Sequence, residues 1–370
     1  MKTRPVISGT LKAFLSVLAV TAAMFQMSSC GGTDKKADEI DSTMGLKDFY
    51  KDYFVIGVSV SPGNLQGDEA ELIKKHFNSI TATNVMKPGP IHPEENTYYW
   101  EDADKVVEFA EANGMKVRGH TLCWHNQTGE WMFVDEEGNP ASKELALRRL
   151  EDHIKTVVSH YKGRIYAWDV LNEVITDDDN AISPYRQTKW LELIGEEYIA
   201  RIFQWAHEAD PDAVLVYNDY NTENPGKRDR IYTMVKGLLD AGVPVHAIGM
   251  QRHDEIGNPS EEKLRATIDK FSSLGVELQV TELDVSIYAG RNDTIDIGFT
   301  AAREQKQIDL YKMEFDVFRD NKDKITGVTF WNVSDRRSWR DSREPQGKVY
   351  PLLFDENLQP KKVFWEIVKF

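Results

Sequence analysis

Glu173 and Glu282 each stand at the end of an apolar segment of the chain, where packing alone does not call for a carboxylate. A carboxylate that is buried without a partner destabilises the fold or loses its charge. Two carboxylates that flank a cleft can hydrolyse a glycosidic bond, because one protonates the leaving oxygen while the other attacks the anomeric carbon. We therefore interpret Glu173 and Glu282 as candidate catalytic residues. The alternative for each alone is a hydrogen-bonded carboxylate that braces loops.

Other residues that could bind a ligand also follow the ends of apolar segments. They are Asn84, Lys87, His120, Trp124, His125, Gln127, Asn172, Asn218, Asp219, Asn221, Gln251, His253, Asp284, Trp331 and Trp339. Barrel enzymes build their active sites at the carboxyl ends of their strands, so this clustering favours a binding site over packing.

The tryptophans divide into two groups by context. Trp124, Trp131, Trp331 and Trp339 lie at strand ends or in loops, where an indole can stack on a sugar ring. The remaining five have helical or mid-strand contexts and are predicted to serve packing: Trp100, Trp168, Trp190, Trp205 and Trp365.

Three histidines, His120, His125 and His253, lie near carboxylates and could in principle ligate zinc or iron. His120 and His125 are five positions apart on a strand and a loop, which directs them to different faces if the segment is extended. Hydrogen bonding to sugar hydroxyls is the favoured interpretation, and we expect neither a metal nor a cofactor.

The elements that must position these residues are short apolar segments alternating with amphipathic helical ones. Strands are predicted at 55–60, 79–84, 116–124, 165–173, 213–219, 247–251, 277–284 and 327–333, and helices include 102–113, 143–161, 188–209, 260–273 and 301–321. Eight such repeats predict an α/β fold, a (β/α)8 TIM barrel with a single catalytic domain. A doubly wound open sheet is the alternative, but no glycine-rich phosphate loop follows the first strand.

The N-terminal segment predicts export. Residues 1–29 resemble the signal peptide of a bacterial lipoprotein, because an apolar run too short to span a bilayer comfortably ends in "MSSC". Cys30 would be the lipidated first residue, 30–44 a flexible tether and 45–370 the catalytic domain. The protein would be a membrane-anchored lipoprotein of the cell surface or periplasm; an ordinary secretion signal is the alternative.

The net charge limits the possible binding partners, and the cysteine content limits the possible disulfides. The net charge is −15, which argues against binding nucleic acid or acidic polymers. The second cysteine, Cys123, lies in the apolar stretch "TLCW" and is predicted to be a buried thiol without a disulfide.

The motifs "NVMKP", "GMKVRGHTLCWHNQT", "WDVLNEV", "VYNDYN", "GMQRH" and "VTELDV" occur in this order. Over residues 45–370 the chain thereby resembles glycoside hydrolase family 10, the endo-β-1,4-xylanases. The resemblance implies a retaining barrel enzyme acting on xylan and xylo-oligosaccharides, monomeric in its catalytic domain, with Glu173 as general acid/base and Glu282 as nucleophile. The sugar-binding residues it implies are Asn84, Lys87, His120, Trp124, Gln127, Asn172, Gln251, His253, Trp331 and Trp339. Within these, Asn172 would bind the 2-hydroxyl of the reacting sugar, and His253 would keep the nucleophile anionic.

The sequence departs from the family pattern at several positions. Thr83 stands where a glutamate contacts the distal glycone sugar, Gly89 where glutamate is common, Gly129 where proline is usual, and Arg252 where glycine is normal. We therefore expect Thr83 to weaken the distal glycone subsite. If a glutamate at position 83 brought no gain in activity, Arg252 would be the first residue to suspect of having changed the pocket.

Two other functions stay open at this point. The loss of glutamate at position 83 is compatible with a β-xylosidase-like enzyme for short oligosaccharides. A non-catalytic xylan-binding surface lipoprotein is disfavoured, because such a protein has no need of a nucleophile. Arg336 and Arg337 could contact acidic xylan substituents, but solvated side chains are the favoured interpretation.

Overall fold

The structure is a computed structural model that describes residues 40–295 and 297–370. The predicted signal peptide at 1–29 and the predicted lipidation site Cys30 lie outside the described residues. Residues Ile40–Phe370 form one unit, which contains all of the candidate site residues.

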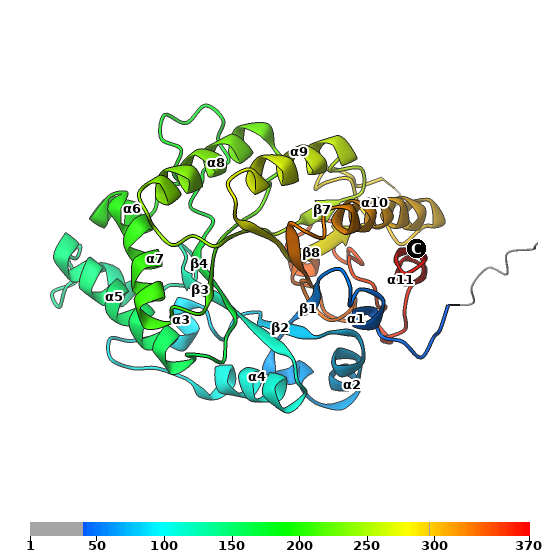
Figure 1. The fold of residues 1–370 in the computed structure, drawn as a ribbon, viewed down its shortest axis with the longest axis horizontal. Helices are drawn as coiled ribbons and strands as arrows, with labels where there is room; N and C mark the ends of the chain where they lie inside the picture. The colour runs from blue at the N-terminus through cyan, green and yellow to red at the C-terminus, as the bar shows by residue number, and fades with distance from the viewer. Residues whose placement is uncertain (1–39, 296) are drawn as a thin grey trace, which may run out of the picture. The chain divides into compact units, whose positions relative to one another are not determined.

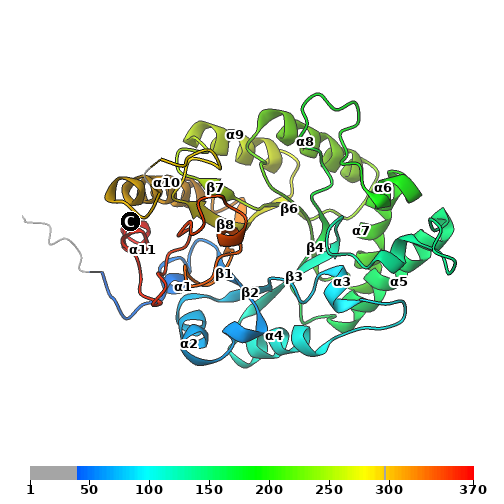
Figure 2. The same cartoon turned by 180° about the vertical axis from the view of Figure 1, so that it is seen from behind.

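Eight parallel strands of the described chain close into a barrel. They are β1 (Val55–Val60), β2 (Ser79–Ala82), β3 (Lys116–Cys123), β4 (Ala167–Asn172), β5 (Val214–Asp219), β6 (Ala247–Met250), β8 (Glu277–Ser286) and β9 (Ile325–Phe330). Each strand pairs with the next along the chain, β6 pairs with β8, and β9 pairs with β1 to close the ring. The strands lie inside a ring of helices (Figures 1 and 2), so the predicted (β/α)8 barrel is confirmed.

A short additional strand, β7 (His253–Glu255), follows β6 after Gln251 and Arg252 and pairs in parallel with the second half of β8. The sequence prediction missed it, because three residues with two acidic side chains carry no strand pattern. The pairing sets His253 opposite Asp284 and so brings the histidine beside β8.

The helices of the described residues surround the strands. They are α1 (Leu46–Phe49), α2 (Gly67–His76), α3 (Pro88–Ile91), α4 (Glu101–Ala112), α5 (Lys143–His160), α6 (Lys189–Ile194), α7 (Glu197–Ala209), α8 (Pro225–Asp240), α9 (Glu261–Ser272), α10 (Ala301–Asp320) and α11 (Lys362–Ile367), with 3-10 turns at Pro62–Asn64, Glu130–Phe133 and Trp339–Ser342. The predicted helix at 188–209 is two helices, because Gly195 has φ +83° and ends α6. No described helix is long and apolar enough to cross a membrane.

Side-chain caps begin several of these helices. The hydroxyls of Ser142, Thr188, Ser260 and Thr300 each accept a hydrogen bond from a backbone N–H of the first turn. Such caps satisfy amide groups that have no partner within the helix. They fix where α5, α6, α9 and α10 start relative to the preceding loops.

The main core lies between the strands and the helices, where apolar side chains of both are buried. Trp168, Trp190 and Trp205 are buried in it, and Trp100 and Trp365 pack against it, so the predicted packing role of these five tryptophans is confirmed.

Polar side chains meet within the barrel. Arg118 of β3 donates through Nη2 to Asp169 of β4 at 2.7 Å and through Nε to Gln279 of β8 at 2.8 Å. Burial raises the pKa of Asp169, but the charge of Arg118 outweighs it and holds that pKa below its usual value. This ion pair braces the strands beneath the candidate site.

Candidate active site

A cleft of about 600 Å³ opens at the carboxyl ends of the strands. Its lining includes both candidate catalytic residues and all ten predicted sugar-binding residues: Glu173, Glu282, Asn84, Lys87, His120, Trp124, Gln127, Asn172, Gln251, His253, Trp331 and Trp339. The structure thus brings these twelve residues together, whereas the chemical role of each remains a prediction.

Glu173 follows β4 directly and has φ +59°, a left-handed conformation that a residue with a side chain adopts only at a cost. Its backbone N–H donates to Asn218 O at 2.9 Å, which holds this turn against β5. The carboxylate accepts two hydrogen bonds, from Trp124 Nε1 at 2.8 Å and from Gln251 Nε2 at 2.9 Å. Two neutral donors from neighbouring strand ends therefore orient Glu173.

Glu282 lies on β8 and its carboxylate is buried. Oε1 accepts from Asn218 Nδ2 at 2.9 Å, and Oε2 accepts from His253 Nε2 at 3.1 Å. Burial raises the pKa of Glu282, but the hydrogen bond from His253 and the attraction to His120 outweigh it, so the pKa lies below its usual value. Glu282 is therefore an anion at neutral pH.

His253 lies between two carboxylates. Its Nδ1 is 3.0 Å from Asp284 Oδ2, and its Nε2 contacts Glu282. Burial lowers the pKa of His253, but the charges and hydrogen bonds of Asp284 and Glu282 outweigh it and raise the pKa to about 9. The imidazole is therefore charged at neutral pH and donates from both nitrogens.

A network of amides joins the two candidate catalytic carboxylates, Glu173 and Glu282. Asn218 Nδ2 donates to Asn172 Oδ1 as well as to Glu282, and its Oδ1 accepts from Thr281 Oγ1 at 2.6 Å. Gln251 Nε2 lies 3.4 Å from Asn172 Oδ1 and also contacts Glu173. Asn218 was among the strand-end residues singled out in the sequence, but the structure gives it a direct contact with Glu282.

His120 and Lys87 bring further polar groups to the cleft. His120 Nδ1 lies 2.9 Å from Asp169 Oδ2, so its orientation depends on the Arg118–Asp169 pair. Lys87 Nζ donates to Asn84 Oδ1 at 2.9 Å and lies 4.9 Å from the centre of the Trp124 ring.

The lining also includes Thr83, His125 and Asn221, which the sequence analysis had singled out as possible ligand-binding residues. It further includes residues that the sequence analysis did not single out: Asn126, Arg186, Tyr220, Ser342 and Arg343. Arg186 donates to the carbonyl oxygen of Glu173 at 3.1 Å and to Tyr220 Oη at 2.7 Å. Arg343 lies 4.9 Å from the centre of the Trp339 ring. Arg186 and Arg343 come from long loops rather than strand ends, so strand periodicity gave no signal for them.

Arg252, which the sequence analysis named as a residue that could change the pocket, is not part of the cleft lining. Its guanidinium is buried instead among Glu223, Asp254 and Glu314. The residue has φ +63°, which explains why a glycine is suited to this position.

Other departures from the family pattern also have structural explanations. A Cβ at Gly89 would lie 2.7 Å from the carbonyl oxygen of Gln127, so only glycine fits where these two segments cross.

Two other residues considered for sugar binding lie outside the cleft lining. Arg336 pairs with Asp68 at 3.2 Å and does not line the cleft. Trp131, a candidate sugar platform, also lies outside the lining; its Nε1 donates to His92 O at 3.2 Å.

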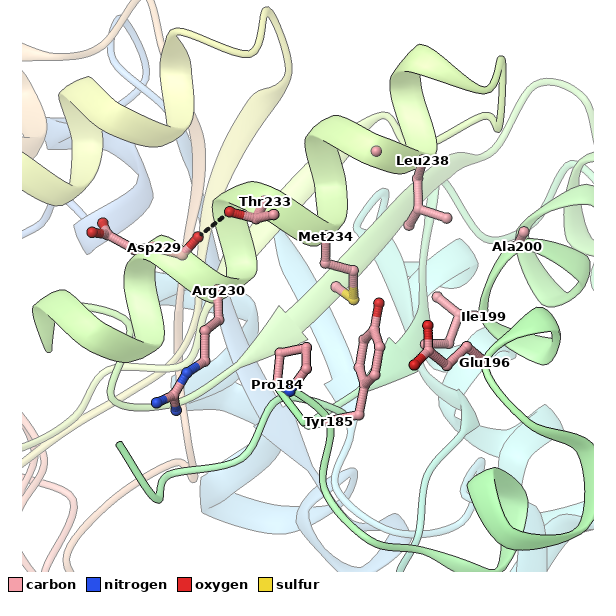
Figure 3. A pocket seen from close by; sticks show the side chains of 11 residues that line it. Pro184, Tyr185, Glu196, Ile199, Ala200, Asp229, Arg230, Thr233, Met234 and Leu238 are labelled. Atoms are coloured by element: carbon pink, nitrogen blue, oxygen red, sulfur yellow. Dashed lines mark hydrogen bonds between the residues drawn. The ribbon is translucent and has the colours of Figure 1, made fainter. Parts of the chain in front are cut away.

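A second cavity, of about 430 Å³, lies between α7 and α8 on the outside of the barrel (Figure 3). Ile199, Met234 and Leu238 form an apolar part of its lining, and Tyr185 lies beside them. Its carboxylates are Glu196 and Asp229, and Asp229 pairs with Lys270 at 2.7 Å. This cavity lacks the opposed, differently held carboxylates of the barrel cleft.

No group of three or more histidine, cysteine, aspartate or glutamate side chains in the described residues is arranged to hold a metal ion. Glu173, Glu282 and His253 are instead hydrogen-bonded to other side chains of the cleft.

Comparisons with known proteins agree with this geometry. The family model "Glycosyl hydrolase family 10" matches residues 45–370. A β-1,4-xylanase of Dictyoglomus thermophilum is 49% identical over 339 residues, which cover 91% of this chain and 93% of that protein. The crystal structure of a xylanase from Paenibacillus barcinonensis, bound to a conduramine derivative, is 48% identical and covers 88% of this chain and 98% of its own, with a TM-score of 0.85. A structure in complex with xylotriose is 40% identical, covers 89% of this chain and 100% of its own, and has a TM-score of 0.85.

Proposed function

The chain belongs to glycosyl hydrolase family 10 and is a retaining endo-1,4-β-xylanase, and we propose that Glu173 is its general acid/base and Glu282 its nucleophile. The observation that carries this assignment is the difference between their partners. Glu282 accepts from the charged His253, whereas Glu173 accepts from the neutral Trp124 and Gln251. A cation beside the carboxylate favours the anion that a nucleophile must be.

The reaction then proceeds in two displacements. Glu282 attacks the anomeric carbon of a xylosyl unit, while Glu173 transfers its proton to the departing glycosidic oxygen, so that one sugar is released and a glycosyl-enzyme ester forms. In the second step Glu173 takes a proton from water, whose oxygen attacks the anomeric carbon and releases Glu282. The new hemiacetal keeps the β configuration.

Asn172 is suited to bind the 2-hydroxyl of the reacting sugar. Its Oδ1 accepts from Asn218, which also donates to Glu282, so the side chain is fixed beside the nucleophile. A hydrogen bond to the 2-hydroxyl strengthens in the transition state of glycoside hydrolysis. Asn172 thereby supports catalysis in addition to binding.

The isosteric variants Glu282→Gln and Glu173→Gln test the two roles. Glu282→Gln should abolish turnover of every substrate, because no nucleophile remains. Glu173→Gln should lose hydrolysis of xylan but retain cleavage of aryl xylosides with good leaving groups, which need little protonation. Equal losses on both substrate types would contradict the assignment.

The configuration of the product tests the retaining mechanism separately. NMR spectra recorded in the first minutes of xylan hydrolysis by the wild-type enzyme should show a β-configured product, and an α product would exclude double displacement.

We also propose a weakened distal glycone subsite at Thr83. Its side chain lines the cleft and its Oγ1 is buried without a hydrogen-bond partner in the described residues. A strong dependence on aglycone contacts would follow, with long oligomers cleaved faster than xylotriose. Products from xylohexaose separate this endo-acting enzyme from a β-xylosidase-like one, because only the latter would release mainly xylose from the outset.

Export as a lipoprotein is a further proposal, supported by the sequence of residues 1–30 alone. Lipidation at Cys30 would hold the xylanase at a membrane surface. Full-length protein expressed in a bacterial host should partition into detergent, and Cys30→Ala should become soluble. Partitioning that is the same for both proteins would indicate ordinary secretion instead.

A further inference from the structure

Arg252 lies between two residues that contact different catalytic carboxylates. Gln251 Nε2 donates to Glu173 at 2.9 Å, and His253 Nε2 lies 3.1 Å from Glu282. The carbonyl oxygen of Gln251 also accepts from the backbone N–H of Glu282 at 2.9 Å. A displacement of the segment 251–253 would therefore change the surroundings of both carboxylates at once.

The backbone of this segment is in a conformation that must be held. Arg252 has φ +63°, in the left-handed region that disfavours residues with a Cβ. Its side chain is fully buried. The hydrophobic effect does not favour burial of a charged guanidinium, and arginine is rarely buried without a charged partner. Specific partners must therefore retain it.

Three carboxylates from three separate elements supply these partners. Nη2 lies 2.5 Å from Glu314 Oε1 of α10 and 2.7 Å from Asp254 Oδ2 of β7, and Nη1 lies 3.5 Å from Glu223 Oε2 in the connection between β5 and α8. All three carboxylate side chains are buried. The guanidinium thus ties the segment 251–253 to a helix, a strand and a loop around it.

The charge balance makes this arrangement rigid. Burial raises the pKa of Asp254 well above its usual value, and Glu314 adds to this effect while Arg252 opposes it. Arg252 is the cation that faces the buried side chains of Glu223, Asp254 and Glu314. Moving the guanidinium away would leave buried carboxylates without their counter-charge, which is strongly unfavourable.

We propose that Arg252 is a positioning residue for both catalytic carboxylates: its buried contacts with Glu223, Asp254 and Glu314 hold Gln251 against Glu173 and His253 against Glu282. This inference rests on the roles proposed above for Glu173 and Glu282. It gives Arg252 a function in catalysis without contact with the sugar.

Three variants test the proposal. Arg252→Gly allows the left-handed backbone but removes the guanidinium. Arg252→Gly/Glu314→Gln also removes one carboxylate that would be left unpaired, and Arg252→Lys keeps the charge, so that folded protein can be measured in each case. Arg149→Met is a matched control: Arg149 is also a buried arginine bonded to a glutamate, Glu95 at 2.5 Å, but it has no contact with the segment 251–253.

Two kinetic measurements report on the two ends of the segment 251–253, one on His253 and the other on Gln251. The acidic limb of kcat/KM follows the ionisation of Glu282, which is faced by His253, Asn218, His120 and Asp169. These groups are unchanged in every variant. Because Arg252→Lys also keeps the positive charge, a limb that moves in the lysine variant as well reports a moved His253. The ratio of kcat/KM between aryl xylosides with poor and with good leaving groups reports proton donation by Glu173, which Gln251 orients.

We expect the acidic limb to move to higher pH by about half a unit or more in the two glycine variants. The poor-to-good leaving-group ratio should fall about tenfold in the same proteins. Arg252→Lys should show smaller changes in the same directions, and Arg149→Met should lower Tm while leaving both measurements at their wild-type values.

Folded Arg252 variants in which Tm falls but both measurements stay unchanged would overturn the proposal, because Arg252 would then serve stability alone. A change in only one measurement would also overturn it, since the segment is proposed to act on both carboxylates. Failure of the proposed catalytic roles is distinguishable, because it would appear independently in Glu173→Gln and Glu282→Gln.

Discussion

His253 donates to Glu282 through Nε2 at 3.1 Å while its Nδ1 lies 3.0 Å from Asp284. The two carboxylates stabilise the charged imidazole, and the imidazole in turn stabilises the anion of Glu282. Trp339 Nε1 and Arg340 Nη1 complete the contacts of Asp284, at 2.8 and 3.0 Å. Glu282, the proposed nucleophile, is thereby connected to the loop that carries Trp339.

This pairing predicts a pH-dependent contribution of His253 to stability. The folded-state pKa of about 9 lies above the ordinary value of 6.5, so the contribution is fully present below pH 6.5 and is lost as the pH rises through 9. Its magnitude is about 3 kcal/mol in the free energy of unfolding. Urea unfolding of wild type and His253→Gln at about pH 6 and about pH 10 measures it. The difference between the two proteins should shrink at the higher pH, and a constant difference would contradict this account.

Asn218 should affect catalysis although it need not touch the sugar. Asn218→Ala removes the donor shared by Glu282 and Asn172, and a hydrogen bond to a charged group corresponds to a loss of about 10- to 100-fold in kcat/KM. Asn126→Ala, which also changes the cleft lining but lies outside this network, should have a much smaller effect. Similar losses in the two variants would show that the network has no special part.

Thr83 allows a gain of function. Thr83→Glu supplies a carboxylate that can bind a hydroxyl of the distal sugar, a contact that corresponds to about 10- to 150-fold in kcat/KM. Hydrolysis of an aryl xylobioside should improve, whereas an aryl xyloside, which does not reach this subsite, should be nearly unaffected. Thr83→Gln controls for side-chain size. If the xylobioside gains nothing, the surrounding residues have reshaped the subsite.

Arg118 should be important for stability. Arg118→Met leaves Asp169 buried without its cation and should lower the free energy of unfolding by about 3 to 5 kcal/mol. Arg336→Met removes a solvent-exposed ion pair with Asp68 and should have a much smaller effect on the free energy of unfolding. Urea unfolding of both variants compares them directly, and equal effects would mean that the barrel interior tolerates the unpaired carboxylate.

Most of the fold could be predicted from the sequence, because the barrel strands are apolar runs bounded by polar residues. The predicted strand at 55–60 coincides with β1, and the predicted helix at 301–321 differs from α10 by one residue at its end. The break at Gly195 and the strand β7 were missed, since a single glycine and a three-residue strand leave too little periodicity to detect.

The sequence by itself determined the barrel and the residues gathered at its carboxyl end, because strand periodicity and residue type at strand ends are local properties. Only the tertiary structure decided which partners each carboxylate has. Glu282 meets His253 and Asn218, and Arg252 turns away from the cleft into a buried cluster, because closure of the barrel brings together side chains from strands, helices and loops far apart in the chain. Hydrogen bonds and charge pairs depend on those distances, and no local pattern encodes them.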